Sequence, residues 1–460
     1  MSGAPVNVSG ARVGVLGLGR SGTGAARLLA DRGAEVYASD VSSDTAIVGA
    51  AAELADLGVA VETGRHDVGR LEECDWIVVS PGIPPRAAVL AEPGVTARPI
   101  YSEVEVASWF ARAPIAAVTG TNGKTTTTAL LGAIAATGGL AVSVAGNIGR
   151  AFSEAVLDDD PQWFVVEVSS FQLARIDHFR PRVAVVLNLT PDHLDVYASM
   201  AEYAADKARI AENMAAGDHL CLNAEDPALE PFGAGRPLER HRFHRRRPVE
   251  RGAWIDDGWI VLSGEPDAGR VASVDAIRIP GDHNLQNALA ASLAGSLMGV
   301  ERGAIASALA EFRGVPHRLE TVAELGGVTF VNDSKATNVD SALVALEAFD
   351  VPLVVILGGR HKESPYAPLA PALERRGRRV LAIGEAAGRI ERELGPVVAV
   401  EVVETLDRAV ARAAAVARPG DVVLLSPACS SYDQFAHYEE RGDRFRELVR
   451  ALGARAGATP

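Results

Sequence analysis

Short apolar runs and amphipathic stretches alternate along the first 110 residues. Runs rich in β-branched residues predict strands at residues 12–16, 35–38 and 76–79. Stretches rich in Ala and Leu predict helices between them, at residues 22–32 and 46–57. Alternating strands and helices are typical of a parallel sheet with helices on both faces. We therefore expect residues 1–112 to form a Rossmann-like α/β domain.

The alternation resumes after a short link at residues 111–114. Apolar runs predict strands at 115–119, 163–168 and 183–189. An amphipathic stretch predicts a helix at 200–213, and a polar stretch with two tryptophans predicts a small β insertion at 240–279. We expect residues 113–315 to form a central domain with a mostly parallel sheet.

A third set of apolar runs follows Pro316, each run preceding a helical pattern. These runs predict strands at 328–332, 353–357, 380–383 and 422–426. Residues 316–460 are therefore expected to form a second Rossmann-like α/β domain. A chain of 460 residues is consistent with three domains of about 150 residues each. Residues 314–316 are candidates for a hinge between the second and third domains.

Composition and charge narrow the class of protein. Hydrophobic residues make up 48% of the chain and charged residues 23%, as in a soluble globular protein. No apolar run reaches the roughly 18 residues of a membrane-spanning helix, and residues 1–7 carry no basic export signal. The net charge of −14 argues against nucleic acid or an anionic membrane as the main partner. We expect a cytoplasmic monomer without membrane insertion.

The three cysteines lie far apart in the sequence and are odd in number. Their spacing matches neither a disulfide framework nor a zinc site. We expect reduced, structural thiols at Cys74, Cys221 and Cys429.

A first glycine loop follows the strand at 12–16. Residues 17–22 fit G-x-G-x-x-G, and Asp40 ends the next predicted strand. Glycines in such a loop let backbone N–H groups approach a diphosphate at the start of a helix. The loop predicts a nucleotide diphosphate, and leaves open whether this belongs to NAD or to a UDP-sugar.

A second glycine loop at residues 119–126, T-G-T-N-G-K-T-T, resembles a P-loop. Its front half is short, because Val118 stands where the full motif has glycine. In such a loop backbone N–H groups surround phosphate oxygens, Lys124 offers a cation to the β and γ phosphates, and the Thr125 hydroxyl can bind Mg²⁺. The motif predicts ATP binding by the central domain.

Further motifs follow in order along nearly the whole chain. They are G-N-I-G at 146–149, E-V-S-S-F-Q-L at 167–173, N-L-T-P-D-H-L-D at 188–195, D-H-N at 282–284, P-H-R at 316–318 and N-D-S-K-A-T-N at 332–338. Together with the second glycine loop, this series resembles the Mur ligases. The third domain also carries G-G-R-H-K at 358–362 and S-P-A-C-S-S-Y-D-Q-F at 426–435, which resemble the family members that add D-glutamate.

The resemblance implies a reaction. Such an enzyme uses ATP to activate the carboxylate of UDP-N-acetylmuramoyl-L-alanine as an acyl phosphate, and D-glutamate then attacks it. The product is a precursor of peptidoglycan, and ADP and phosphate are released. A carboxylate is a poor electrophile at neutral pH, so the phosphate supplies the leaving group.

The resemblance also implies roles for individual residues. Catalytic roles fall to Lys124, Glu167, His193, Lys207 and Asn147. ATP contacts fall to Gly120, Thr121, Asn122, Gly123, Lys124, Thr125, Thr126, Asn284, Asn287, Arg318, Asp333 and Lys335. Asp333 would fix the ribose or orient Arg318. Two Mg²⁺ ions are implied, with Thr125, Glu167, His193 and a carbamylated Lys207 as the expected ligands.

The two other substrates are assigned in the same way. The UDP-substrate is expected at Arg20, Ser21, Asp40, Ser42 and Asn147. D-Glutamate is expected at Thr337, Lys362, Ser431 and Tyr438, although the family can carry phenylalanine at the position of Tyr438. His317 is expected to be structural.

Two other functions remain open. A related ATP-driven ligase with another acceptor, such as a folylpolyglutamate-type enzyme, would share most of the motifs. An NAD-binding redox or regulatory protein would account for the first glycine loop alone, but the second loop speaks against it.

Overall fold

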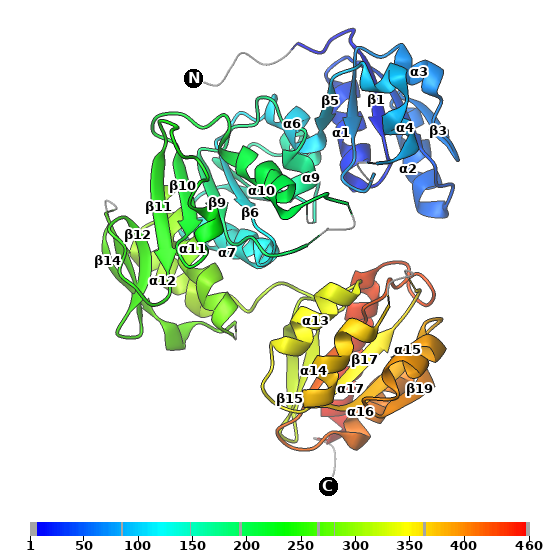
Figure 1. The fold of residues 1–460 in the computed structure, drawn as a ribbon, viewed down its shortest axis with the longest axis vertical. Coiled ribbons are helices and arrows are strands. Elements are labelled where there is room, and N and C mark those ends of the chain that lie inside the picture. Colours follow the sequence, from blue (N-terminus) through cyan, green and yellow to red (C-terminus); the bar gives the residue numbers. More distant parts are fainter. Residues whose placement is uncertain are drawn as a thin grey trace. The chain divides into compact units, whose positions relative to one another are not determined.

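The computed structural model describes residues 7–83, 86–147, 149–192, 196–264, 267–279, 281–361 and 365–456. The chain divides into two compact units, Met1–Phe312 and Arg313–Pro460 (Figure 1). The described residues contain no helix that is both long and apolar enough to cross a membrane. Cys74, Cys221 and Cys429 are all buried, and no disulfide joins them.

The first unit begins with a parallel sheet in the order β3-β2-β1-β4-β5. Its strands are β1 (Arg12–Leu16), β2 (Glu35–Asp40), β3 (Ala60–Thr63), β4 (Trp76–Val79) and β5 (Ile100–Ser102). Its helices are α1 (Arg20–Asp31), α2 (Thr45–Asp56), α3 (Val68–Glu72), α4 (Ala88–Ala91), α5 (Pro93–Thr96) and α6 (Glu103–Ser108).

A second sheet in the same unit has the order β14-β13-β12-β11-β10-β9-β6-β8-β7. Its strands are β6 (Ile115–Thr119), β7 (Val142–Gly146), β8 (Trp163–Glu167), β9 (Val183–Val186), β10 (His219–Asn223), β11 (Glu239–His244), β12 (Gly252–Asp256), β13 (Trp259–Ser263) and β14 (Gly269–Ser273). Its helices are α7 (Lys124–Thr137), α8 (Phe152–Asp158), α9 (Ser170–Leu173), α10 (Met200–Ala208), α11 (Asp282–Leu297) and α12 (Arg302–Glu311), with short 3-10 turns η1 (Arg209–Ala211), η2 (Pro227–Leu229) and η3 (Val274–Ala276).

Strand β6 lies inside this sheet and is buried on both faces. Ala116 and Val118 belong to one hydrophobic cluster, whereas Ile115 and Ala117 belong to another. This explains why the sequence shows a continuous apolar run there and no alternation. The predicted β insertion extends the sheet, with β12, β13 and β14 pairing antiparallel.

The second unit holds one sheet in the order β15-β16-β20-β17-β18-β19. Only the pairing of β15 with β16 is antiparallel among its described strands. The strands are β15 (Glu320–Leu325), β16 (Val328–Asn332), β17 (Leu353–Gly358), β18 (Gly377–Ile383), β19 (Val400–Glu404) and β20 (Val422–Leu425). The helices are α13 (Val339–Glu347), α14 (Ala370–Arg376), α15 (Ala387–Leu394), α16 (Leu406–Val416) and α17 (Tyr438–Ala456), with a 3-10 turn, η4 (Ala367–Leu369).

The expected fold class is confirmed: three mostly parallel sheets in an α/β arrangement. The strand predicted at 183–189 ends earlier, at Val186, because Asn188 accepts a hydrogen bond from Thr121 N at 3.0 Å and so belongs to the second glycine loop. The helix predicted at 200–213 gives way to a 3-10 turn after Ala208.

Candidate functional site

The second glycine loop joins β6 to α7 and depends on two glycines. Gly120 and Gly123 have φ values of 150° and 83°, which side-chain-bearing residues rarely adopt. A Cβ at Gly123 would lie 2.4 Å from Oδ1 of Asn287. The loop can therefore follow this path only with glycine at these positions. It leads directly into the N-terminus of helix α7, whose free N–H groups can bind an anion.

Residues after β9 brace this loop from the neighbouring strand. Asn122 N donates to Oδ1 of Asn188 at 2.8 Å, and Asn188 Nδ2 donates to the carbonyl of Asn122 at 3.1 Å. Lys124 Nζ donates to the carbonyls of Gly120 and Thr121, at 3.0 and 2.7 Å. The lysine is thus held over the loop where phosphates would lie.

Glu167 lies at the carboxyl end of β8, next to β6 in the sheet. Its side chain is only 2% exposed. Oε1 accepts a hydrogen bond of 3.0 Å from Asn147 Nδ2, while Oε2 is buried and has no hydrogen-bond partner among the described residues. A buried carboxylate oxygen without a donor is costly, so this position suits a cation.

Lys207, on helix α10, reaches the same place and is 1% exposed. Its Nζ donates to the carbonyl of Gly120 at 2.8 Å and lies 4.6 Å from the ring centre of Tyr203. Burial, and then the charge of Lys124, lowers the pKa of Lys207 well below its usual value of 10.5. The lowered pKa favours the uncharged form of the amine, which is the nucleophilic form.

The donor set around the loop fits a hard divalent cation. Thr125 is buried at the start of α7 and offers its hydroxyl, and Glu167 contributes the buried Oε2. His193 lies outside the described residues.

Another metal-capable group lies elsewhere in the sheet, on β10 and β11: His219, Glu239 and His241. The side chains of this group already interact with one another or with a neighbouring arginine. His219 Nδ1 lies 3.1 Å from His241 Nε2, and Glu239 accepts from Arg251 at 2.7 Å.

Asn284 and Asn287 lie on the first turns of α11, facing the glycine loop. Asn287 Nδ2 donates to Oδ1 of Asn284 at 2.9 Å, and Oδ1 of Asn287 accepts from Thr127 Oγ1 at 3.2 Å. The structure therefore brings both asparagines, which the resemblance assigns to ATP, to the start of α7.

The first glycine loop is organised by Asp40. Its Oδ2 accepts from Leu18 N at 2.7 Å and its Oδ1 from Ser42 N at 2.8 Å. Arg20 and Ser21 open helix α1, and Arg20 Nη1 donates to the carbonyl of Gly149 at 3.0 Å. The two predicted substrate segments, the first loop and G-N-I-G, therefore lie side by side.

A pocket of about 440 Å³ lies between the two sheets of the first unit. Its walls include Ser80, Arg86, Phe171, Arg175 and Asp206. Phe171 and Asp206 are close in sequence to Glu167 and Lys207, so the pocket adjoins the elements that carry the site.

In the second unit, Asp333 follows β16 and is buried. Its Oδ2 accepts from Ser426 Oγ at 2.8 Å and its Oδ1 from Leu319 N at 3.2 Å. Burial raises the pKa of Asp333 to about 7, and Ser426 and Arg318 partly offset this. Lys335 N donates to the carbonyl of His317 at 3.0 Å. These contacts hold Arg318 and Lys335 on neighbouring segments.

The segments expected to bind D-glutamate converge in this unit. Ala428 N donates to the carbonyl of Ala336 at 2.9 Å, and Ser334 Oγ donates to that of Tyr438 at 2.8 Å. Loops carrying Thr337 and Ser431 therefore meet the start of α17, where Tyr438 stands. Lys362 lies outside the described residues.

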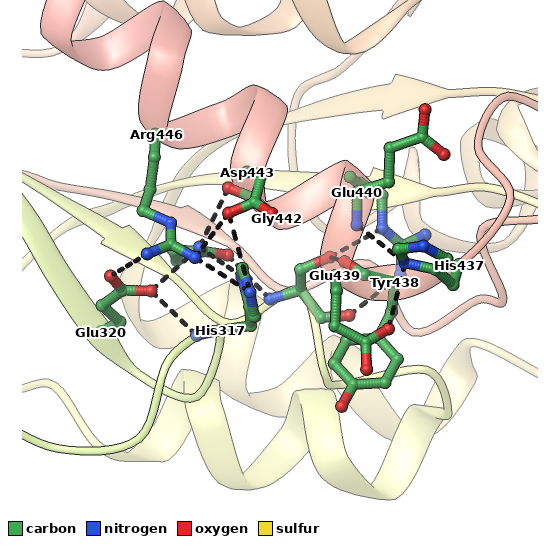
Figure 2. A network of polar contacts seen from close by, with 12 residues as sticks. His317, Glu320, His437, Tyr438, Glu439, Glu440, Gly442, Asp443 and Arg446 are labelled. Atoms are coloured by element: carbon green, nitrogen blue, oxygen red, sulfur yellow. Dashed lines mark hydrogen bonds and ion pairs between the residues drawn. The ribbon is translucent and has the colours of Figure 1, made fainter. Parts of the chain in front are cut away.

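A polar network ties the start of this unit to α17 (Figure 2). Arg446 Nη2 lies 3.0 Å from His317 Nε2 and 2.6 Å from Oδ1 of Asp443. His317 N donates to Glu320 at 2.8 Å. His317 has a φ of 63°, and burial, followed by the charge of Arg446, lowers its pKa. A structural role for His317 fits these contacts.

Sequence reasoning missed two residues that organise the sites. Asn188, which braces the second loop, lies inside a quoted motif and could have been noticed there. Arg441, buried on α17, lies outside every quoted motif and carries no sequence signal.

Family models match three parts of the chain. They are the Mur ligase MurD-like, N-terminal domain at residues 11–98, the Mur ligase middle domain at 118–295, and the Mur ligase, glutamate ligase domain at 317–429.

Relatives in sequence span nearly the whole chain. The UDP-N-acetylmuramoylalanine--D-glutamate ligase of Acidobacterium capsulatum is 45% identical, over 97% of each chain. That of Anaeromyxobacter dehalogenans is 46% identical, over 97% of this chain and 99% of the relative.

Solved structures share the fold at low identity. A pseudomurein peptide ligase type C from Methanothermus fervidus matches with a TM-score of 0.56 and 20% identity, over 96% of this chain and 100% of that one. The MurF ligase from Thermotoga maritima, in complex with ADP, matches with a TM-score of 0.55 and 17% identity, over 97% of this chain and 96% of that one.

Proposed function

Because this chain belongs to the Mur ligase family, we propose that it uses ATP to join D-glutamate to UDP-N-acetylmuramoyl-L-alanine. Its relatives of 41–46% identity carry the name of that ligase. The enzyme makes a peptidoglycan precursor. The division into domains at 1–112, 113–315 and 316–460 is part of the same proposal.

One observation carries the chemistry. Glu167 lies at the end of the strand next to the loop that holds Lys124, and its Oε2 has no hydrogen-bond partner in the described part of the chain. Transfer of a phosphoryl group requires its oxygen charges to be neutralised by cations in fixed positions. Here Lys124, the N-terminus of α7 and the carboxylate of Glu167, which suits a cation, lie at one edge of the sheet.

The reaction balances in two steps. An oxygen of the L-alanyl carboxylate attacks the γ-phosphorus, the bond to the bridging oxygen breaks, and ADP leaves. The amine of D-glutamate then attacks the carbonyl carbon, a proton is lost from nitrogen, and phosphate leaves with the C–O bond electrons. Lys124 and the first N–H groups of α7 would hold the phosphates through the first step.

Mg²⁺ fits this site and would be held by Thr125 and Glu167, with His193 as the further expected ligand. Once bound, the ion neutralises charge on the β and γ phosphates. Asn147 would orient Glu167, because the two side chains are hydrogen-bonded.

We infer that Lys207 becomes carbamylated and supplies oxygens to a second Mg²⁺. Its uncharged amine would attack CO₂ and lose a proton, giving a carbamate. The support is its burial and its lowered pKa. A carbamate replaces a nitrogen donor with the oxygen donors that Mg²⁺ prefers.

The remaining contacts are those that the resemblance to the family implies. Arg20, Ser21 and Ser42 would meet the UDP end, with Asp40 shaping the first loop and Asn147 near the reacting end. Gly120 to Thr126, with Asn284 and Asn287, would bind ATP, joined by Arg318, Asp333 and Lys335. Thr337, Lys362, Ser431 and Tyr438 would bind D-glutamate. We infer a cytoplasmic monomer that requires neither nucleic acid nor membrane insertion.

The test is incorporation of radiolabelled D-glutamate into UDP-N-acetylmuramoyl-L-alanine with ATP and Mg²⁺, with L-glutamate in parallel. We expect label from D-glutamate alone and one phosphate released per amide. Transfer of glutamate to a folate acceptor, and none to the muramoyl nucleotide, would establish the folylpolyglutamate-type alternative. The molar mass measured by light scattering during size-exclusion chromatography would test whether the protein is a monomer.

A further inference from the structure

Arg441 is a charged side chain buried inside the second unit. It lies on the first turn of α17 and is 1% exposed. Among the residues that the structure describes, it forms no ion pair with a carboxylate. Removing a guanidinium from water is costly, so its contacts must compensate. Burial lowers the pKa of Arg441 to about 10.

The guanidinium bridges two loops. Its Nε donates to Ser334 Oγ at 3.0 Å, and Nη2 donates to the carbonyls of Ser334 and Cys429, at 3.0 and 3.2 Å. Nη1 donates to the carbonyl of Ser430 at 3.3 Å. Only arginine offers a rigid fork of donors that can reach several acceptors at once.

These two loops carry residues assigned to D-glutamate. Ser334 lies three residues before Thr337, and Ser430 immediately precedes Ser431. The same Ser334 hydroxyl donates to the carbonyl of Tyr438, on the turn that carries Arg441.

A third loop, at residues 358–361, packs against the same group. A Cβ at Gly359 would lie 3.1 Å from Nη1 of Arg441 and 2.2 Å from the carbonyl oxygen of Ser430. Arg360 N donates to that carbonyl at 2.9 Å. Arg441 therefore lies at the junction of the described segments that carry Thr337, Ser431 and Tyr438, and it also contacts the loop at 358–361.

We propose that Arg441 is a positioning residue for the acceptor site, which sets the spacing of the loops that bind D-glutamate without touching the substrate. The inference rests on the proposed function. The contacts of the UDP-substrate are assigned to the first unit alone, so loosening this junction should weaken the binding of D-glutamate more than that of the UDP-substrate.

The test uses Arg441→Lys, which keeps the charge and loses the fork. Arg444→Met is the matched control, because Arg444 lies on the same helix but pairs at the surface with Asp407 and Glu447. For each enzyme, KM is measured separately for D-glutamate, ATP and the UDP-substrate, together with kcat and the thermal unfolding midpoint.

For Arg441→Lys we expect KM for D-glutamate to rise about tenfold or more, because small misplacements of binding groups have large effects. KM for the UDP-substrate should stay within about twofold. The Arg444→Met enzyme should match the wild type. An unchanged KM for D-glutamate, or an equal rise in all three constants, would overturn the proposal.

If Arg441→Lys does not fold, Ser334→Ala removes one acceptor of the same fork. It should raise KM for D-glutamate relative to KM for the UDP-substrate, by less than Arg441→Lys does, and the absence of such a relative rise would again overturn the proposal. Failure of the wild-type enzyme to incorporate D-glutamate would instead refute the proposed function, so the two failures are distinguishable.

Discussion

Lys207 Nζ donates a hydrogen bond of 2.8 Å to the carbonyl of Gly120, so a lysine from α10 lies under the phosphate loop. The neighbouring Lys124 donates to the same carbonyl at 3.0 Å. Two ammonium groups sharing one acceptor repel each other, which favours a neutral Lys207.

This relationship predicts a dependence on CO₂. Enzyme prepared in CO₂-free buffer should be less active, and bicarbonate should restore activity. Labelling with ¹³C-bicarbonate should give a carbamate signal by NMR that is absent in Lys207→Met. Full activity without CO₂, and no such signal, would contradict the carbamate.

The lowered pKa of Lys207 also predicts the direction of a pH effect on stability. Between its folded pKa and its usual value of 10.5, the unfolded chain binds more protons, so this residue makes unfolding harder as pH rises. The free energies of unfolding of unmodified wild type and Lys207→Met should be measured in urea at pH 7 and pH 9. From pH 7 to pH 9, the free energy of the wild type should rise relative to that of the variant.

Glu167→Gln should separate activity from stability. We expect kcat to fall by about 100-fold or more, because the variant loses a carboxylate at the phosphates. Without ligands its free energy of unfolding should be at least that of the wild type, since the variant removes a buried charge whose Oε2 has no hydrogen-bond partner among the described residues. Glu311→Gln, at the exposed end of α12, is the control and should change neither quantity. A stability loss like that of a core cavity would refute this account of Glu167.

Asp333 predicts a pH effect of the opposite sign. Its pKa is raised from 3.8 to about 7, so its contribution is fully present below 3.8 and is lost as pH rises through about 7. The loss is on the order of a few kcal/mol. Asp333→Asn should make the stability of the second unit less dependent on pH.

The measurement for Asp333 must report on the second unit. All five tryptophans precede residue 260, so their fluorescence follows the first unit. Amide hydrogen exchange of β16 and β20 at pH 5 and pH 8 is suitable. Equal protection at both pH values in the wild type would refute the buried, titrating carboxyl.

Two glycines in helices should respond oppositely to alanine. A Cβ at Gly442 would lie 2.1 Å from Nδ1 of His317, so Gly442→Ala should destabilise by roughly 1–3 kcal/mol. At Gly49, in α2, a Cβ meets nothing within 4 Å, so Gly49→Ala should stabilise by up to about 1 kcal/mol. Thermal unfolding followed by circular dichroism tests both.

Ligands should change the arrangement of the two units. Contacts for ATP are assigned to both, and the boundary lies at Phe312 and Arg313, beside the hinge candidates at 314–316. We expect small-angle scattering with a non-hydrolysable ATP analogue and the UDP-substrate to differ from that of the free protein. Superimposable profiles would contradict closure.

The sequence by itself determined the fold class and the second glycine loop. Strands such as β6 and β17 are buried on both faces and read as continuous apolar runs, which pattern alone identifies. Edge strands such as β3 and β19 are short and half exposed, so no strand was predicted there. The loop is equally local, because its glycines, lysine and threonines all lie within residues 119–126.

Only the tertiary structure decided which distant groups meet. The burial of Glu167 and Lys207 and the hydrogen bonds of Arg441 depend on the order of strands in the sheets and on helix packing. Burial sets the cost of a charge and the direction of a pKa shift, and burial is a property of the folded chain. A sequence names the charged residues, but it does not say which of them lose water.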